Sequence, residues 1–241
     1  MLAAAPPLAW EIKVLTMDVD FARARRFMRD GQLAPNGVSD PLLLGAMDEV
    51  AREAFLPHEL RHRAYADEAV PLGGGRVMLA PMVLARLLQL ALPQPGERAL
   101  VLAAGTGYGS AILALMGLQV LAIEADPALA ELARNAVEFA LGANRPEFRQ
   151  GDPRLGAPEG APFRLILIEG AVESLPAPLL AQLGEGGRLV TIRRGAGTRG
   201  GGNMGRAVLY RRAGGAVSEV MGLDATAPVL EDFASPLGFM L

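Results

Sequence analysis

The stretch "ALVLAAGTGYGSAIL", residues 99–113, decides the fold of this chain. Its first half is apolar and strand-like, its middle carries Gly105, Gly107 and Gly109, and its end has the composition of a helix. Glycine lets the backbone turn tightly and approach a ligand without a clash at Cβ, and a helix N-terminus offers free N–H groups. The spacing is G-x-G-x-G, not the G-x-G-x-x-G that suits a dinucleotide pyrophosphate. We therefore predict a cofactor-binding turn between a strand and a helix.

Around this turn, strand-like and helical segments alternate, which predicts a parallel sheet with right-handed crossovers. The chain then ends in two strand-like segments with no helix between them, which we expect to pair antiparallel. The fold class is thus α/β, with a doubly wound, mostly parallel sheet, antiparallel C-terminal strands and an N-terminal helical cap. Strands are expected at residues 97–104, 118–126, 147–152, 163–170, 186–194, 205–212 and 216–224, and helices at 109–117, 127–142 and 175–184.

The cap is predicted from helix signals upstream of the turn. Apolar residues at helical spacing mark a helix over 18–33, and Asp40 followed by Pro41 is typical of a second helix start. A loop-rich connection with one glycine cluster leads to a third helix, which opens at Pro81. We expect a cap over 17–95 and a cofactor-binding core over 96–241, together forming one compact domain.

Residues 1–16 differ in composition from the rest and hold the only lysine and the only tryptophan. We interpret them either as an extension ahead of a start at Met17 or as an N-terminal arm packed on the body. They do not resemble a signal peptide, and no apolar run is long enough to span a membrane. We therefore predict a cytoplasmic protein.

Composition excludes several classes of function. The chain has no cysteine, so disulfides, thiolate metal sites and a cysteine nucleophile are ruled out. Its two histidines, His58 and His62, are spaced i, i+4 but have no evident third ligand, and we predict no metal site. A net charge of −3 gives no reason to expect nucleic acid or an anionic membrane as a partner. Nothing indicates the oligomeric state.

Two carboxylates end the strands that follow the glycine turn. Glu124 lies nineteen residues after Gly105 and is placed to accept hydrogen bonds from both hydroxyls of a ribose. Asp152 ends the next strand, within reach of an adenine amino group. Each feature alone has another explanation. The glycine turn would serve only tight packing, Glu124 would be a solvated surface acid, and Asp152 would only cap a turn. Taken together and in this order, they predict a site for an adenosine-type cofactor without phosphates.

Four segments resemble the protein-L-isoaspartate O-methyltransferase family. The segment "AYADEAVPLGGGRVMLAPMVLARLLQL" (64–90) and the segment "APFRLILIEGAVESLPAPLLAQLGEGGRLV" (161–190) carry its most specific motifs. "RRFMRDGQL" with "GVSDPLLLGAMDEVAREAFLP" (25–57) is similar to its N-terminal helices, and "PGERALVLAAGTGYGSAILA" (95–114) to its cofactor loop.

The resemblance implies an S-adenosylmethionine-dependent enzyme that methylates isoaspartyl carboxylates in damaged proteins. Glu124 would hold the ribose of this cofactor and Asp152 its adenine. The substrate would lie near Leu79, Pro81 and Glu169. The residues expected around the methionine part of the cofactor are Ala103, Gly105, Thr106, Gly107 and Gly109.

The chain departs from the family pattern at four positions. Leu79 replaces a serine beside the substrate carboxylate, and Ala103 replaces an acid expected to hold the methionine amino group. Pro153 follows Asp152 in place of glycine and restricts that turn. Glu169 ends a strand where the family has an uncharged residue. It would repel a substrate carboxylate, serve as a base or contact for a neutral or cationic acceptor, or bond to the next helix N-terminus.

Three hypotheses follow for the activity. A carboxylate acceptor is already ionised near neutral pH, so methyl transfer to it needs alignment rather than a general base. The departures at Leu79 and Ala103 favour an alternative in which the chain binds the cofactor but methylates another acceptor or has lost turnover. A nicotinamide-dependent oxidoreductase is disfavoured by the glycine spacing and by the antiparallel tail.

Overall fold

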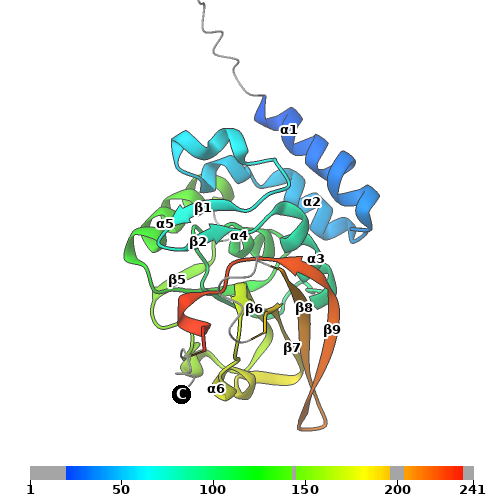
Figure 1. Cartoon of the computed structure of the whole chain (residues 1–241), viewed down its shortest axis with the longest axis vertical. Coiled ribbons are helices and arrows are strands. Elements are labelled where there is room, and N and C mark those ends of the chain that lie inside the picture. The colour runs from blue at the N-terminus through cyan, green and yellow to red at the C-terminus, as the bar shows by residue number, and fades with distance from the viewer. Residues whose placement is uncertain (1–19, 143–144, 196–203, 236–241) are drawn as a thin grey trace, which may run out of the picture.

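A computed structural model describes residues 20–142, 145–195 and 204–235. Its centre is a seven-stranded sheet in the order β5-β4-β3-β6-β7-β8-β9 (Figure 1). The pairings from β5 to β7 are parallel, and β8 and β9 are added antiparallel. The strands are β3 (Arg98–Leu102), β4 (Gln119–Glu124), β5 (Glu147–Gln150), β6 (Phe163–Val172), β7 (Leu183–Arg193), β8 (Met204–Ala213) and β9 (Ala216–Thr226). The predicted fold class is confirmed.

The two faces of the sheet carry separate apolar cores because successive strand residues point to opposite sides. On β3, Ala99 and Val101 pack toward the cap side, and Leu100 and Leu102 pack toward the other side. The helices on the cap side are α3 (Pro81–Ala91), α4 (Tyr108–Leu115) and α5 (Pro127–Leu141), and α6 (Ala177–Ala181) contributes to the opposite core.

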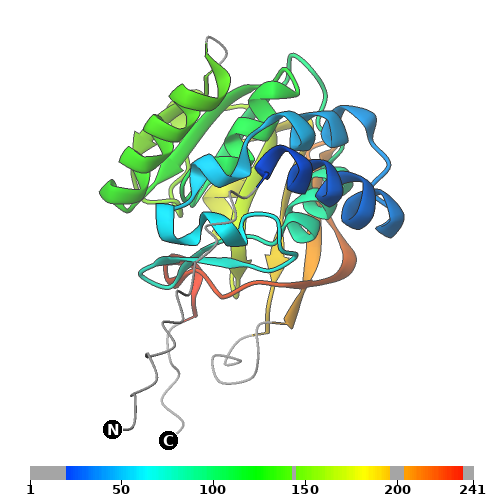
Figure 2. The same cartoon turned by 90° about the horizontal axis from the view of Figure 1, so that it is seen from above.

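The cap continues the first of these cores. It comprises α1 (Phe21–Phe27), a π-helical turn (Met28–Leu33), α2 (Pro41–Glu49), two 3-10 helices (Arg52–Phe55 and His58–Arg63) and the hairpin of β1 (Val70–Gly73) and β2 (Arg76–Met78). From above, its helices lie beside the green helices α4 and α5 (Figure 2). Because cap and sheet share one buried cluster, the hairpin is held close to the carboxyl ends of the central strands.

The predicted helix signals act as expected. The Asp40 carboxylate accepts from the N–H groups of Leu42 and Leu43, and Pro41 is the first residue of α2. Asp126 caps α5 in the same way. Residues 1–16, interpreted from the sequence as an extension or an arm, lie outside the described residues, as do most residues of the glycine-rich segment 195–205, which its composition predicts to be a loop. No helix in the described ranges combines the length and apolar character needed to cross a bilayer.

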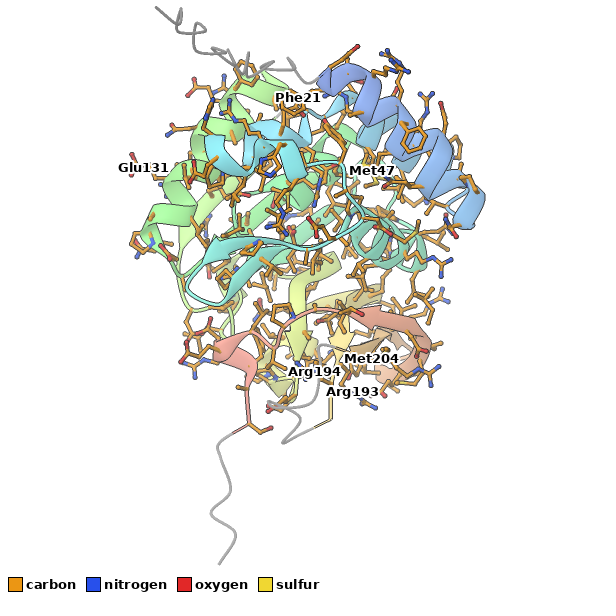
Figure 3. All side chains as sticks on the ribbon, turned by 45° about the horizontal axis from the view of Figure 1, so that its top comes forward. Phe21, Met47, Glu131, Arg193, Arg194 and Met204 are labelled. Carbon is orange, nitrogen blue, oxygen red and sulfur yellow. The ribbon has the colours of Figure 1, made fainter. Side chains whose placement is uncertain are left out.

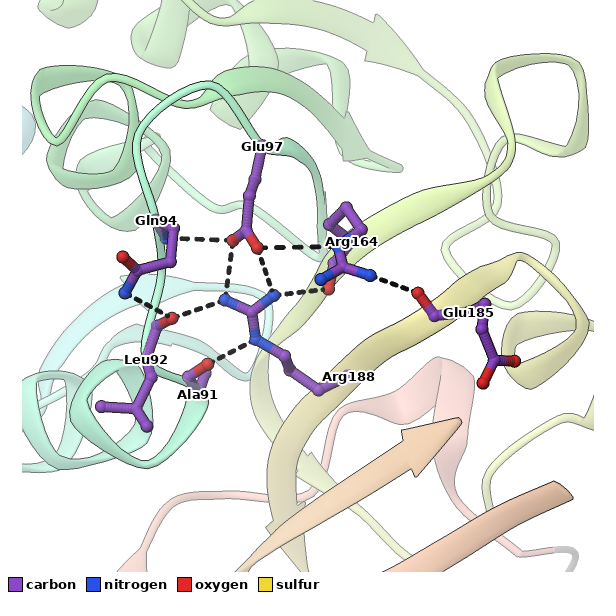
Figure 4. Close-up of polar contacts among 7 residues, drawn as sticks. All are labelled: Ala91, Leu92, Gln94, Glu97, Arg164, Glu185 and Arg188. Carbon is purple, nitrogen blue, oxygen red and sulfur yellow. Dashed lines mark hydrogen bonds and ion pairs between the residues drawn. The ribbon is translucent and has the colours of Figure 1, made fainter. Parts of the chain in front are cut away.

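An ion pair joins the amino-terminal side of the sheet to α3 (Figure 4). The Arg188 guanidinium donates to both carboxylate oxygens of Glu97, at 2.8 and 2.7 Å, and to the carbonyls of Ala91, Leu92 and Arg164. Both side chains are nearly buried, with 10% and 12% exposed. This cluster lies at the opposite end of the strands from the glycine turn, so its role is structural.

Candidate active site

The glycine turn lies at the point where the sheet reverses its direction of growth. From β3 the chain adds β4 and β5 on one side, and β6 and β7 on the other. In such sheets ligands bind in the crevice at the carboxyl ends of the strands beside this point. Gly105 and Gly107 adopt φ of +57° and +88°, a region that favours glycine. A Cβ at Gly107 would lie 2.8 Å from Phe148 Cζ, so this glycine is also required by packing.

Glu124 lies at this crevice and is fully buried, so it is not a surface acid. Its Oε1 accepts from Arg76 Nη1 at 2.8 Å and from the N–H of Asp126 at 3.0 Å. Its Oε2 accepts from Arg76 Nη2 at 2.9 Å and from the N–H of Gly105 at 2.6 Å. A carboxylate has about four lone-pair positions, and here all of them are used.

Arg76 therefore occupies the acceptor positions that a ribose would need. The same guanidinium also donates to the carbonyl of Ala103 at 2.7 Å, so it ties the cap hairpin to both strand ends. The prediction that Glu124 holds a ribose therefore requires Arg76 to move away from at least one of its oxygens.

Asp152 follows β5 on the same edge of the sheet. Its carboxylate accepts from the Arg154 backbone N–H at 2.8 Å and from the Arg154 guanidinium at 2.6 Å. The hydrogen bonds from Arg154 hold the pKa of Asp152 below its usual range. The turn-capping interpretation thus describes the observed contacts, and contact with an adenine stays a prediction.

Glu169 lies against α4 and not against the helix that follows it in the chain. Glu169 is 8% exposed, and a Cβ built on Gly109 would lie 2.5 Å from Oε1 of Glu169. Burial raises the pKa of Glu169 to about 8, while Arg76 and Arg52 oppose this rise and Glu124 adds to it. The proposed bond to the N-terminus of the next helix is therefore wrong, because the carboxylate faces the glycine turn.

A family model described as protein-L-isoaspartate(D-aspartate) O-methyltransferase matches residues 30–194. The chain belongs to this family. A protein-L-isoaspartate O-methyltransferase of Methylorubrum populi is 46% identical over 171 residues, which cover 71% of this chain and 79% of the relative. A protein-L-isoaspartate O-methyltransferase of Aeropyrum pernix is 41% identical over 177 residues, which cover 72% of this chain and 68% of the relative.

Solved structures agree with this fold. A putative protein-L-isoaspartate O-methyltransferase of Plasmodium falciparum, in complex with S-adenosyl-L-homocysteine, superposes with a TM-score of 0.74 at 18% identity. The superposition covers 86% of this chain and 98% of that one. Family membership confirms the predicted methyltransferase fold and S-adenosylmethionine as the methyl donor.

The position of the family serine is part of the apolar core in this chain. Leu79 is 1% exposed, and its carbonyl accepts from Arg52 Nη2 at 2.7 Å. Pro81 starts α3 two residues later, and Thr106 is buried in the glycine turn. Ala103, at the position of the family acid, has a φ of +54° and is 1% exposed. Assignment of these residues to substrate or cofactor stays a prediction.

Two site residues were not predicted from the sequence. Arg76 pairs with Glu124, which lies 48 positions later in the chain, and no local sequence pattern indicates this contact. Arg52 is fully buried, donates to the carbonyls of Ala64 and Leu79, and lies 4.8 Å from the ring centre of Tyr108. Its charge within the apolar segment "REAFLP" was the one available signal, because a charged residue is rarely buried without a partner.

Proposed function

We propose that this chain transfers a methyl group from S-adenosylmethionine to the carboxylate of isoaspartyl residues in proteins. The observation that carries the proposal is the family match over residues 30–194, which spans both the cap and the cofactor turn. The curated relatives it matches bear the name of this activity and share up to 46% of aligned residues with it.

The residues at the crevice suit this cofactor. The glycine turn leaves the backbone accessible, and Glu124, whose carboxylate is held by two N–H groups, would accept hydrogen bonds from the ribose. Glu169 keeps one buried oxygen without a hydrogen-bond partner in the described structure, as expected of a group that meets a ligand. When bound, S-adenosylmethionine supplies an electrophilic methyl group on a sulfonium.

The chain's own contribution is binding and alignment. An isoaspartyl carboxylate is ionised near neutral pH, so no residue has to remove a proton from it. Burial raises the pKa of Glu169, and Arg76 and Arg52 lie close enough to oppose that rise, so their two positive charges also favour an anionic acceptor in the same region. Rate enhancement then depends on holding the acceptor oxygen in line with the methyl group.

The direct test is methyl transfer from labelled S-adenosylmethionine to an isoaspartyl peptide and to the matching aspartyl peptide. We expect label in the isoaspartyl peptide and background counts in the aspartyl one. Binding of S-adenosylhomocysteine with no transfer to either peptide would contradict the proposed acceptor. Binding of NAD in its place would contradict the methyltransferase assignment.

The substitution Leu79→Ser tests whether the serine that Leu79 replaces would contribute to methyl transfer. Restoring a hydroxyl is expected to raise kcat/KM for the isoaspartyl peptide about tenfold over Leu79→Ala, since a hydrogen bond to a charged group contributes roughly 1.5–3 kcal/mol. The alanine variant is the matched control because both changes open a similar space in the core. Both are expected to lower the stability by about 2–5 kcal/mol. Equal kcat/KM values for the two variants would show that the hydroxyl has no role.

A further inference from the structure

Glu169 and Ala103 each come directly after the last paired residue of two neighbouring strands. In the parallel pair of β3 and β6, Leu102 is opposite Ile168, so the next positions are Ala103 and Glu169. Ala103 follows the end of β3 and packs in the core opposite the cap, whereas Glu169 lies within β6 and its carboxylate contacts Gly109 of α4 on the cap side. The adjacent strand thus brings a carboxylate to the first turn of α4, beside the glycine turn, although position 103 itself carries none.

The carboxylate of Glu169 is built into the turn but lacks a full set of partners. It lies on Gly109, in the first turn of α4, where only glycine leaves room for it. Its Oε1 is buried and has no hydrogen-bond partner, and no ion pair of Glu169 occurs within the described residues. A buried polar atom without a partner costs free energy, so such an atom at a ligand crevice indicates contact with the ligand.

The charged groups that face Glu169 come from three elements. Arg76 on β2 and Arg52 in the 3-10 helix Arg52–Phe55 favour its anion, and Glu124 on β4 disfavours it. Both arginines are committed elsewhere, Arg76 to Glu124 and Ala103, and Arg52 to the carbonyls of Ala64 and Leu79. A ligand cation is thus the group that this oxygen still lacks.

We infer that Oε1 of Glu169 accepts a hydrogen bond from the α-ammonium of the methionine part of S-adenosylmethionine. This inference rests on the proposed function, because it requires that cofactor. Of the two positive centres of the cofactor, the sulfonium has no proton to donate, whereas the ammonium has three N–H donors. Ammonium–carboxylate hydrogen bonds are about twice as strong as neutral ones.

This assignment also accounts for a carboxylate in a site that receives a carboxylate substrate. A free Glu169 anion would repel the isoaspartyl group, but its pairing with the ammonium removes that net charge. A role as general base is not needed, because the acceptor arrives ionised. Glu169 is therefore a cofactor-positioning residue of this chain.

The ionisation of Glu169 supplies a readout that a purely structural role would not produce. Because burial raises its pKa to about 8, the carboxyl is mostly protonated at pH 7 in the free protein. Pairing with a cation favours the anion and lowers that pKa, so cofactor binding releases a proton. The affinity is then expected to rise as the pH increases from 6 toward 8.

The test measures binding of S-adenosylhomocysteine by calorimetry to the full chain and to Glu169→Gln, in buffers of different ionisation enthalpy at pH 7. A thiobutyrate analogue that lacks only the α-amino group serves as the matched ligand. Glu131→Gln is the matched variant, since Glu131 is exposed on α5 and lies away from the crevice (Figure 3). We expect Glu169→Gln to bind S-adenosylhomocysteine at least tenfold more weakly and the analogue within twofold of the wild type.

Proton release distinguishes the outcomes further. The wild type and Glu131→Gln are expected to release close to one proton per S-adenosylhomocysteine bound, and Glu169→Gln none. Unchanged affinity in Glu169→Gln, or an equal loss for both ligands, would overturn the inference while leaving the proposed function intact. Failure of the wild type to bind S-adenosylhomocysteine at all would overturn the proposed function itself. Retained binding of the analogue shows that the variant is folded.

Discussion

Glu124→Gln is expected to weaken the binding of S-adenosylhomocysteine about a hundredfold, because hydrogen bonds to a charged group contribute roughly 1.5–3 kcal/mol each. The carboxylate can accept from both ribose hydroxyls, whereas an amide has one acceptor oxygen. The change also removes an acceptor from the N–H of Gly105 or Asp126, both of which orient this side chain. Titration calorimetry on the wild type and the variant measures the effect.

Arg76→Gln is the control that separates ribose recognition from the ion pair. Arg76 occupies one position on each oxygen of Glu124, so its removal is expected to tighten cofactor binding about tenfold, the value of roughly one net hydrogen bond. Opposite effects of the two variants would support competition between Arg76 and the ribose. A similar loss in both would contradict it and indicate that the cofactor needs the intact pair.

Arg188→Met is expected to lower the free energy of unfolding by about 3–5 kcal/mol, because it leaves the nearly buried carboxylate of Glu97 without its partner. For a chain of this size the corresponding fall in Tm is roughly 10 °C. Three backbone carbonyls, those of Ala91, Leu92 and Arg164, also lose their donor. Thermal unfolding followed by circular dichroism gives the measurement.

The matched control is Arg211→Met, which changes an exposed arginine opposite Arg188 on β8. Although burial alone would raise it, the pKa of Glu97 is lowered by the hydrogen bonds from Arg188 and the Gln94 N–H. The ion pair therefore stabilises the fold fully at pH values above the pKa that Glu97 has in the unfolded chain. This stabilisation is lost as the pH falls through the lower pKa that Glu97 has in the folded protein. We expect the Tm gap between wild type and Arg188→Met to narrow toward acidic pH. A gap independent of pH, or one matched by Arg211→Met, would contradict this role for the pair.

The sequence predicted the order of elements well because the signals that define them are local. Strand periodicity, the cap at Asp40 and the prolines that open the helices each act within a few residues. The cofactor turn was predicted for the same reason, since its glycines, the strand before it and the helix after it are contiguous. The resemblance to the family was likewise carried by contiguous segments.

The predicted site residues were less completely described. Glu124 was identified from its distance along the chain, but not its burial or its pairing with Arg76. Asp152 was identified as a strand-end acid, and its contact with Arg154 makes it also a turn cap. Glu169 was recognised as unusual, yet the helix that it contacts was not the one expected. These differences concern side-chain partners rather than the placement of the backbone.

The sequence alone determined the α/β order of this chain, its glycine turn and the strand ends at which carboxylates gather. Only the tertiary structure decided that a cap arginine takes one acceptor position on each oxygen of Glu124, and that the Glu169 carboxylate lies against Gly109. The physical reason is the distance along the chain over which each kind of interaction acts. Backbone conformation follows from neighbours in the chain, whereas the partner of a buried charge depends on which distant segments packing brings within hydrogen-bond distance.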